Sequence, residues 1–177
     1  GEVLIGDCCT YQRAAHLGPL PLPGGEQAIR EPWRVGLAAA ILALPREELE
    51  SALPQWLRPM GWQTLVRIVE QGIYAPVSTG MGRLFDAVAA IAGVGVRVNY
   101  EGQAAVELEQ LLDERIDGRY CFTIQQKKDA PWVVDQRPVI RAALEDIHKS
   151  VAPGGISVRF HRAVVDLCRE ICSQLRD

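Results

Sequence analysis

The sequence has no apolar run long enough to cross a membrane. A membrane-spanning helix needs about 20 consecutive apolar residues. The longest apolar stretch among the 177 residues, 35–44, reaches about half that length and fits a buried helix. The first residues also lack the basic start and the cleavage site of a secretory signal. We therefore expect a cytoplasmic protein that has no membrane partner.

An excess of basic residues is missing as well. The chain has 19 Lys and Arg against 22 Asp and Glu, which gives a formal net charge of −3. Surfaces that bind nucleic acids carry clustered positive charge. We therefore expect no nucleic-acid partner.

Cysteines are too few for a disulfide framework. There are five, an odd number that includes the adjacent pair Cys8-Cys9. Small domains held by disulfides have a denser and even set. This count indicates reduced thiols, as in the cytoplasm.

The chain also lacks an initial methionine and begins with Gly1-Glu2, so we expect it to be cut from a longer protein. What is present is typical of a globular domain, with 48% hydrophobic and 23% charged residues. The length suits one domain with a sizeable core.

Periodicity predicts an α+β fold that is mainly α-helical, with a few short strands. We expect short strands or a hairpin in 1–17 and an extended, proline-rich connector in 18–25. Further helices and strands follow from apolar spacing and from Gly and Pro boundaries. The helices are expected at 47–53, 61–71, 81–92, 103–115, 137–149 and about 156–175, and the strands at 120–124 and 132–134.

Another helix should follow the two glycines and end at Pro45. Apolar residues from Ile29 to Leu44 recur close to the helical period of 3.6. Pro32 interrupts this pattern. Either the helix is kinked there, or it begins near Glu31 with Pro32 at its first position.

The glycines Gly24-Gly25 are the first candidate for ligand contact. Glycine lets a backbone approach a ligand closely, and free N–H groups at a helix start suit a phosphate. A plain turn also accounts for the local pattern and is the favoured interpretation when the pattern is taken alone. A role of the two glycines in binding therefore depends on further observations.

Two other groups of residues have a structural and a chemical interpretation. Asp86 lies in an otherwise apolar helix, where an ion pair with Arg83 is favoured over a catalytic role. His161, Cys168 and Cys172 share one face of the last helix and resemble a soft-metal site. Core packing is the favoured interpretation of these three, since free cysteine behaves as a small hydrophobe.

Several long and specific segments occur in order along nearly the whole chain. The segments are Gly1-Glu2-Val3-Leu4-Ile5-Gly6-Asp7, Arg13-Ala14-Ala15-His16-Leu17, the run 21–34 that contains Pro23-Gly24-Gly25, the run 78–90 that contains Gly82-Arg83-Leu84-Phe85-Asp86, the run 100–109 that contains Glu101-Gly102-Gln103, and Arg159-Phe160-His161. In this order they resemble the HypF family of hydrogenase-maturation carbamoyltransferases.

This resemblance implies a reaction and a partner. The family uses carbamoyl phosphate and ATP, with Mg, to make a carbamoyl adenylate. It transfers the carbamoyl group to the C-terminal cysteine of the partner protein HypE, where the group becomes the cyanide ligand of nickel–iron hydrogenase. The resemblance places residues 1–177 in a single incomplete domain, the helical middle part of the C-terminal carbamoyltransferase domain. That domain is similar to the TsaD family within the actin-like ATPase superfamily.

The resemblance also implies site residues. In TsaD-like proteins the second glycine of a Pro-Gly-Gly turn contacts the ligand, and Gly25 matches it. We expect Gly24 and Gly25 to bind the nucleotide, with Asp7 and Glu2 as further candidates, and name no catalytic residue. The ligand-binding aspartate of the relatives is replaced by Ile5, so Asp7 is a substitute for it only by proximity.

The metal-binding motif and later ligand segments of the family have no counterpart in the chain. We therefore expect no metal ligand in the chain, one wall of the site only, and no activity of the isolated fragment. An exposed half-core could make it dimerise.

Two rival functions stay open. The chain could be a docking module for the partner maturation protein, with the predicted helix 103–115 facing that partner. It could instead belong to an enzyme like the tRNA threonylcarbamoyl transferases, against which the acidic composition argues.

Overall fold

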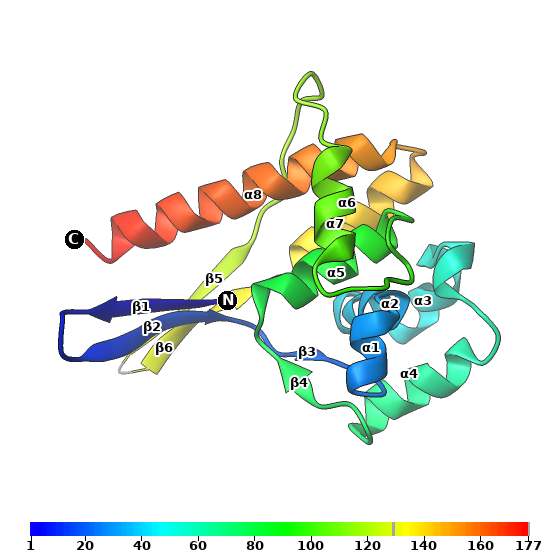
Figure 1. The fold of residues 1–177 in the computed structure, drawn as a ribbon, viewed down its shortest axis with the longest axis horizontal. Helices are drawn as coiled ribbons and strands as arrows, with labels where there is room; N and C mark the ends of the chain where they lie inside the picture. Colours follow the sequence, from blue (N-terminus) through cyan, green and yellow to red (C-terminus); the bar gives the residue numbers. More distant parts are fainter. Residues whose placement is uncertain (129, 177) are drawn as a thin grey trace.

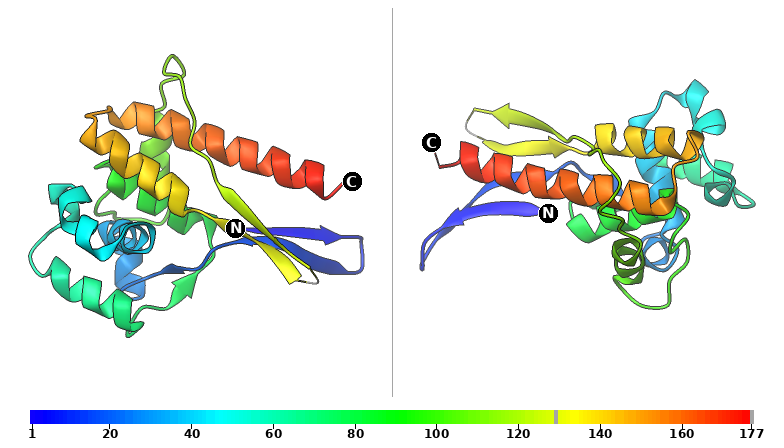
Figure 2. Two further views of the ribbon diagram at one scale, coloured as in Figure 1. Left: turned by 180° about the vertical axis from the view of Figure 1, so that it is seen from behind. Right: turned by 90° about the horizontal axis from the view of Figure 1, so that it is seen from above.

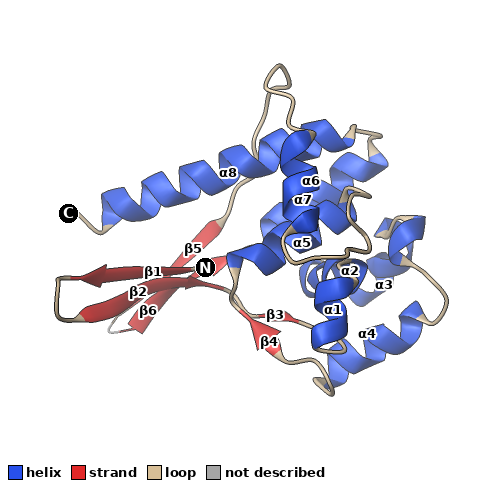
Figure 3. Ribbon diagram, in the orientation of Figure 1, coloured by secondary structure: helices blue, strands red, loops and turns tan. Residues whose placement is uncertain are grey.

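The computed structural model describes residues 1–128 and 130–176. Most helices gather on one side of the molecule, and a mixed sheet extends away from them on the other, where the last helix of the chain also reaches (Figures 1 and 3). The predicted α+β class, mainly α-helical, is confirmed. No helix of the described part is long and apolar enough to span a bilayer.

The main sheet has the strand order β1-β2-β6-β5. β1 and β2 form the expected antiparallel hairpin, β2 runs parallel to β6, and β6 pairs antiparallel with β5. A second, two-stranded sheet joins β3 to β4. The strands are β1 (Glu2–Gly6), β2 (Tyr11–Leu17), β3 (Leu20–Pro21), β4 (Val77–Ser78), β5 (Thr123–Lys127) and β6 (Ala130–Asp135).

The longest helix, α8 (Pro153–Gln174), lies against one face of the main sheet (Figure 2). Between the helix and the sheet lies a small apolar cavity of about 150 Å³. It is lined by Leu17 and Val134 from the sheet and by Leu167 and Ile171 from the helix. The hairpin of β1 and β2 protrudes from the helical body and keeps Leu4, Ile5 and Tyr11 exposed.

The helical body is built around α2 (Trp33–Ala43). Eight of its eleven residues are buried, which marks it as a helix enclosed on most sides. Its neighbours include α5 and α7, whose buried faces contribute Leu84, Ile91 and Ile140 to the same core. The other helices are α1 (Glu26–Arg30), α3 (Arg46–Ala52), η1 (Gln55–Leu57), α4 (Trp62–Gln71), α5 (Met81–Ile91), α6 (Gln103–Gln110) and α7 (Arg137–His148).

Pro32 separates two helices rather than kinking one. α1 ends at Arg30, and Pro32 is the residue just before α2, where its carbonyl accepts the N–H of Gly36 at 2.9 Å. Proline lacks the N–H that a continuous helix would need. The prediction of a late start near Glu31 is therefore closer than that of a kinked helix.

Several boundaries differ from the prediction. α6 ends at Gln110 instead of 115, because Asp113 accepts the backbone N–H of Arg115 and forms a local turn. α8 begins earlier, at Pro153, since proline suits the first turn of a helix. The strand expected at 120–124 begins only at Thr123.

Candidate functional site

The predicted glycine turn lies between β3 and α1. Gly24 has φ +89°, and Gly25 has φ +60° with ψ −118°, a conformation that is essentially restricted to glycine. The expectation that both N–H groups are free is wrong. Gly24 donates to the carbonyl of Tyr74 at 2.9 Å, and Gly25 donates to the carbonyl of Leu22 at 2.8 Å.

The turn leaves open space beside Gly25. A side chain at Gly25 would meet nothing within 4 Å, so a ligand can approach the backbone there. α1, which follows, has only five residues and supplies little helix dipole. The turn can therefore offer close backbone contact to a ligand, but not a cradle of free amide donors.

The nearest positive charge is Arg34, and it is already paired. Its Nη1 atom lies 3.4 Å from where a side chain of Gly24 would begin, while its Nε donates to Glu31 Oε2 at 2.5 Å. Burial by itself would raise the pKa of Glu31, but the hydrogen bond and charge of Arg34, with a smaller contribution from Arg97, hold that pKa below its usual range. Glu31 thus stays ionised and neutralises the guanidinium beside the turn.

Asp7 and Glu2 are not gathered at the glycine turn. Asp7 lies in the exposed turn of the hairpin, where its Oδ1 accepts the N–H groups of Cys9 and Thr10 at 2.8 and 2.7 Å. These bonds lower its pKa. The seven residues of β2, about 20 Å of extended chain, separate this end of the hairpin from the chain that leads to Gly24.

Glu2 lies at the other end of the hairpin, opposite His16, and forms an ion pair with Arg13 at 2.9 Å. Of the four candidates, only Gly24 and Gly25 are therefore brought together.

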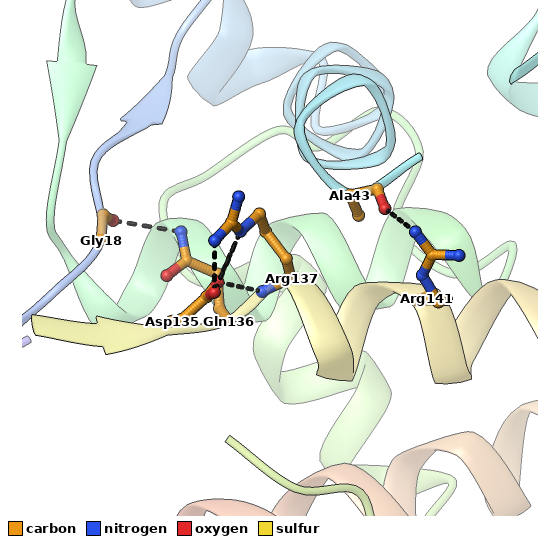
Figure 4. Close-up of polar contacts among 6 residues, drawn as sticks. All are labelled: Gly18, Ala43, Asp135, Gln136, Arg137 and Arg141. Atoms are coloured by element: carbon orange, nitrogen blue, oxygen red, sulfur yellow. Dashed lines mark hydrogen bonds and ion pairs between the residues drawn. The ribbon is translucent and has the colours of Figure 1, made fainter. Parts of the chain in front are cut away.

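Topology indicates a second candidate ligand site, at the carboxyl ends of the parallel strands β2 and β6. Ligands often bind at such strand ends in open α/β sheets. A shallow cavity of about 230 Å³ opens there, lined in part by Gly18, Asp135, Gln136 and Arg137. Figure 4 shows that these residues bond to one another. Asp135 accepts the backbone N–H of Arg137 at 2.9 Å and two side-chain N–H groups of Arg137, so the start of α7 already holds a carboxylate.

Gln136 joins the start of α7 to the residue that follows β2. Its amide donates to the carbonyl of Gly18 at 3.1 Å, and a side chain at Gly18 would begin only 2.9 Å from Gln136 Oε1. On the far side, Arg141 donates to the carbonyl of Ala43, the last residue of α2, at 2.7 Å (Figure 4). The polar residues around this cavity therefore have a structural role. Sequence reasoning missed it, although Asp135 just before a helix is a typical start signal.

The signature around Asp86 also joins elements. Asp86 is 3% exposed, and its Oδ2 lies 2.9 Å from Arg83 Nη1, which confirms the predicted ion pair. The two atoms are close without hydrogen-bond alignment. Arg83 also reaches Glu101, from the family-like segment 100–109, at 3.2 Å. Burial raises the pKa of Asp86 to about 6, against the charge of Arg83 and helped by that of Glu101.

The last family-like segment, Arg159-Phe160-His161, connects α8 to its neighbours. Arg159 and the hydroxyl of Tyr120 both donate to Asp146 Oδ2, at 2.5 and 2.7 Å. Burial and this carboxylate raise the pKa of Tyr120 far above its usual value. Phe160 stacks edge-on against Phe85 of α5, with ring centroids 4.8 Å apart. These contacts hold helices together and leave no group free for chemistry.

The predicted core packing of Cys168 and Cys172 is wrong, because both are exposed on α8. His161 is half-buried and hydrogen-bonds to the carbonyl of Ser157 at 2.8 Å. Within residues 1–128 and 130–176, no group of three or more His, Cys, Asp or Glu is arranged to hold a metal ion. All five cysteines are unpaired.

Comparison with known proteins decides the family. The family model described as "Carbamoyltransferase, Kae1-like Domain, second subdomain" matches residues 1–177. The chain belongs to the HypF carbamoyltransferase family. The family predicted from the ordered signatures is confirmed, and those signatures account for helix contacts and for the glycine turn.

Curated HypF proteins match the chain over part of their own length. Carbamoyltransferase HypF of Rhizobium leguminosarum bv. viciae is 46% identical over 112 residues, which is 63% of this chain and 14% of that protein. Carbamoyltransferase HypF of Synechocystis sp. is 32% identical over 190 residues, covering 98% of this chain and 24% of that protein. The chain thus spans about a quarter or less of these relatives.

Solved HypF structures have the same fold. The crystal structure of full-length HypF in the phosphate- and nucleotide-bound form matches with a TM-score of 0.86 and 32% identity, over 99% of this chain and 22% of that one. The crystal structure of T. kodakarensis HypF matches with a TM-score of 0.70 over 93% of this chain and 22% of that one. At 23% identity it supports the fold alone.

Proposed function

We propose that the chain is part of a HypF-type carbamoyltransferase that acts in nickel–iron hydrogenase maturation. In this proposal the intact protein hydrolyses carbamoyl phosphate to carbamate and phosphate, and the carbamate reacts with ATP to form a carbamoyl adenylate with release of pyrophosphate. The thiol of the C-terminal cysteine of a HypE-type partner then attacks the carbamoyl carbon, and AMP leaves. Loss of water from the thiocarbamate would leave a cyano group on sulfur, which would become the cyanide ligand. Family membership supports this, together with the nucleotide and phosphate bound by a full-length relative.

The contribution of residues 1–177 is one wall of the nucleotide site. The open, glycine-restricted backbone at Gly25 is the observation that carries this assignment. Gly24 holds the turn in place, and Glu2 and Asp7 are secondary candidates, since they lie away from it. We infer a single incomplete domain whose second wall is supplied by the rest of the protein.

Magnesium enters this proposal with the nucleotide. No carboxylate of the described residues joins two others in a metal-binding group, so Mg would be held by the phosphates and by ligands outside the chain. The proposed reaction needs a reduced thiol on the partner, and the five cysteines of this chain are unpaired. Both fit a cytoplasmic location.

Replacing Gly25 in the intact protein tests the assignment. Gly25→Leu should lower ATP-dependent carbamoyl transfer by roughly 100-fold or more, because the side chain fills the open space and strains the backbone. Gly61→Leu is the matched control. Gly61 also precedes a helix with positive φ, and a side chain there meets nothing within 4 Å. Its variant should fold slightly less stably and keep its activity.

Transfer rates and melting temperatures would be measured for both variants. Full activity of Gly25→Leu would remove the glycine turn from the site. An equal loss in Gly61→Leu would show that the effect comes from backbone strain in general.

A docking role is the second candidate, favoured by apolar residues that are exposed at two places. α6 and the residue after it expose Val106 and Leu111, and the β1–β2 hairpin exposes Leu4, Ile5 and Tyr11. In this proposal the surfaces contact the partner maturation protein or a second copy of the chain. Co-elution with the partner that is insensitive to ATP would favour docking over catalysis.

A further inference from the structure

Arg34 has more hydrogen-bonding capacity than its protein partners use. Its Nε donates to Glu31 Oε2, whereas the described residues accept no hydrogen bond from its Nη1 or Nη2. The side chain is only 17% exposed, yet neither of these two nitrogens is enclosed by the protein. A guanidinium is flat and carries five N–H donors, of which Nη1 and Nη2 hold four. The edge formed by Nη1 and Nη2 is therefore accessible to a ligand.

Two contacts fix the position of this guanidinium. Its Cζ atom lies over the ring of the neighbouring Trp33, 5.0 Å from the ring centroid. Glu31, at the end of α1, holds the Nε from another direction. A side chain that is already stacked on an aromatic ring and bonded through one nitrogen loses little freedom when it binds a ligand. Arg34 is thus preorganised for binding.

Nη1 of Arg34 lies against the glycine turn. A side chain at Gly24 would begin 3.4 Å from this nitrogen and 3.7 Å from the Cβ of Gln27. Gln27 and Glu31 also line an open cavity of about 520 Å³ along α1. The guanidinium therefore adjoins the backbone of the turn, which continues into the open position at Gly25.

The charges around Glu31 favour an anion at this place. The carboxylate of Glu31 is shared by two guanidiniums, since Arg97 lies 3.8 Å from its second oxygen. Glu26 and Arg30, which line the same cavity, offset each other in charge. One negative charge against two positive charges leaves a net positive charge beside the turn, although solvent screens the exposed Arg97. An anion at Nη1 and Nη2 would complete the neutralisation.

We propose that Arg34 binds a phosphate group of the nucleotide at the glycine turn, through the edge formed by Nη1 and Nη2. This inference rests on the proposed function. Two nitrogens of one guanidinium match two oxygens of a phosphate, and such charge-assisted hydrogen bonds are strong. Arg34 supplies donors that Gly24 and Gly25 do not, because the N–H groups of both glycines are used within the protein. Glu31 competes with the phosphate for the same guanidinium and so limits the affinity.

The test uses the intact protein with two phosphate ligands, ATP and inorganic tripolyphosphate. Arg34→Met should weaken the binding of both about tenfold or more, because the charge-assisted hydrogen bonds are lost. Glu31→Gln keeps an oxygen that accepts the N–H of Arg34 but removes the competing charge. It should tighten the binding of both ligands by about two- to fivefold. Calorimetric titrations would give the affinities, and melting temperatures would show that each variant is folded.

Arg119→Met is the control for the loss of one arginine. Arg119 pairs with Asp166 of α8 at 2.7 Å rather than with a residue of the turn, so this variant should bind both ligands like the wild type. Unchanged tripolyphosphate affinity in Arg34→Met overturns the inference. Unchanged or weaker binding in Glu31→Gln also overturns it, whether or not Arg34→Met folds, because a purely structural ion pair gives no gain in affinity when its carboxylate is neutralised.

Comparison with Gly25→Leu separates this inference from the proposed function. If Gly25→Leu fails to bind ATP while Arg34→Met binds normally, only the role of Arg34 is wrong. If Gly25→Leu and Arg34→Met both bind normally, the proposed site itself fails.

Discussion

At the scale of single residues, Asp86 has an energetic cost that its neighbours only partly offset. It is buried on α5, with Arg83 on the same helix and Glu101 from the segment before α6 as its charged neighbours. Its pKa of about 6 lies above the value near 3.9 of an unfolded chain. The folded state therefore holds this proton more tightly than the unfolded state does.

The sign of the resulting pH dependence follows directly. Stabilisation linked to the proton is fully present below about pH 3.9 and is lost as the pH rises to about 6, by at most about 3 kcal/mol. The free energy of unfolding of the wild type minus that of Asp86→Asn should decline over this range and then level off. Denaturant titrations at pH 4, 5, 6 and 7 would measure it.

Asp135→Asn is a control of opposite sign. A side-chain hydrogen bond from Arg137 holds the pKa of Asp135 below its usual range, so its stabilisation is present at neutral pH and is lost as the pH falls. A flat difference curve for Asp86→Asn would show that Asp86 is not the titrating group.

The sequence supported residue-level predictions where the partner is close along the chain. The pair of Arg83 with Asp86 is three residues apart on one helix and could be predicted from that spacing. The network of Tyr120, Asp146 and Arg159 joins residues 13 to 39 positions apart, for which spacing gives no signal. For the same reason the separation of Asp7 from Gly24 and Gly25 could not be predicted, because it depends on the direction of β2.

At the scale of elements, helices were predictable because one face of each is buried. α3, α4, α5 and α7 lie within a residue of their predicted bounds, since Gly or Pro marks at least one end. β3 and β4 were missed because strands of two residues are too short to show alternation. α6 was predicted too long because apolar Leu111 and Leu112 extend its pattern beyond Gln110.

Two glycines on neighbouring elements should respond in opposite ways to alanine. Gly95 has φ +56°, and a side chain there would begin 2.7 Å from the Cβ of Ala104 in α6 and 2.8 Å from its Cα. Gly95→Ala should therefore lower the free energy of unfolding by about 2–4 kcal/mol, through strain and overpacking.

Gly82 provides the contrast. It lies inside α5, where a side chain would meet nothing within 4 Å. Gly82→Ala should raise the free energy of unfolding by about 0.5–1 kcal/mol, since alanine loses less backbone entropy in a helix. Urea denaturation of both variants checks the pair. A destabilised Gly82→Ala would show that the outer face of α5 is less open than it is here.

At the scale of the whole molecule, the helical body has a closed core, whereas the end of the sheet formed by the β1–β2 hairpin exposes apolar side chains. The interior of the body includes Leu37, Ile91, Leu144 and Phe160, each fully buried. The protruding hairpin keeps Leu4, Ile5 and Tyr11 exposed. Such an apolar surface is typical of a contact with another part of a protein or with a second copy. The hairpin should therefore determine whether the chain self-associates.

The same division predicts how residues 1–177 behave with nucleotide. The amide donors of the glycine turn are used internally, and Arg34 beside it is paired with Glu31. Calorimetric titration of the isolated chain with ATP and Mg should show no binding tighter than about 1 mM, and the chain should nevertheless melt in one cooperative transition. The intact protein should bind ATP under the same conditions. Binding by the isolated chain below about 100 μM would mean that the open face at Gly25 is a sufficient site, and that the second wall serves transfer rather than binding.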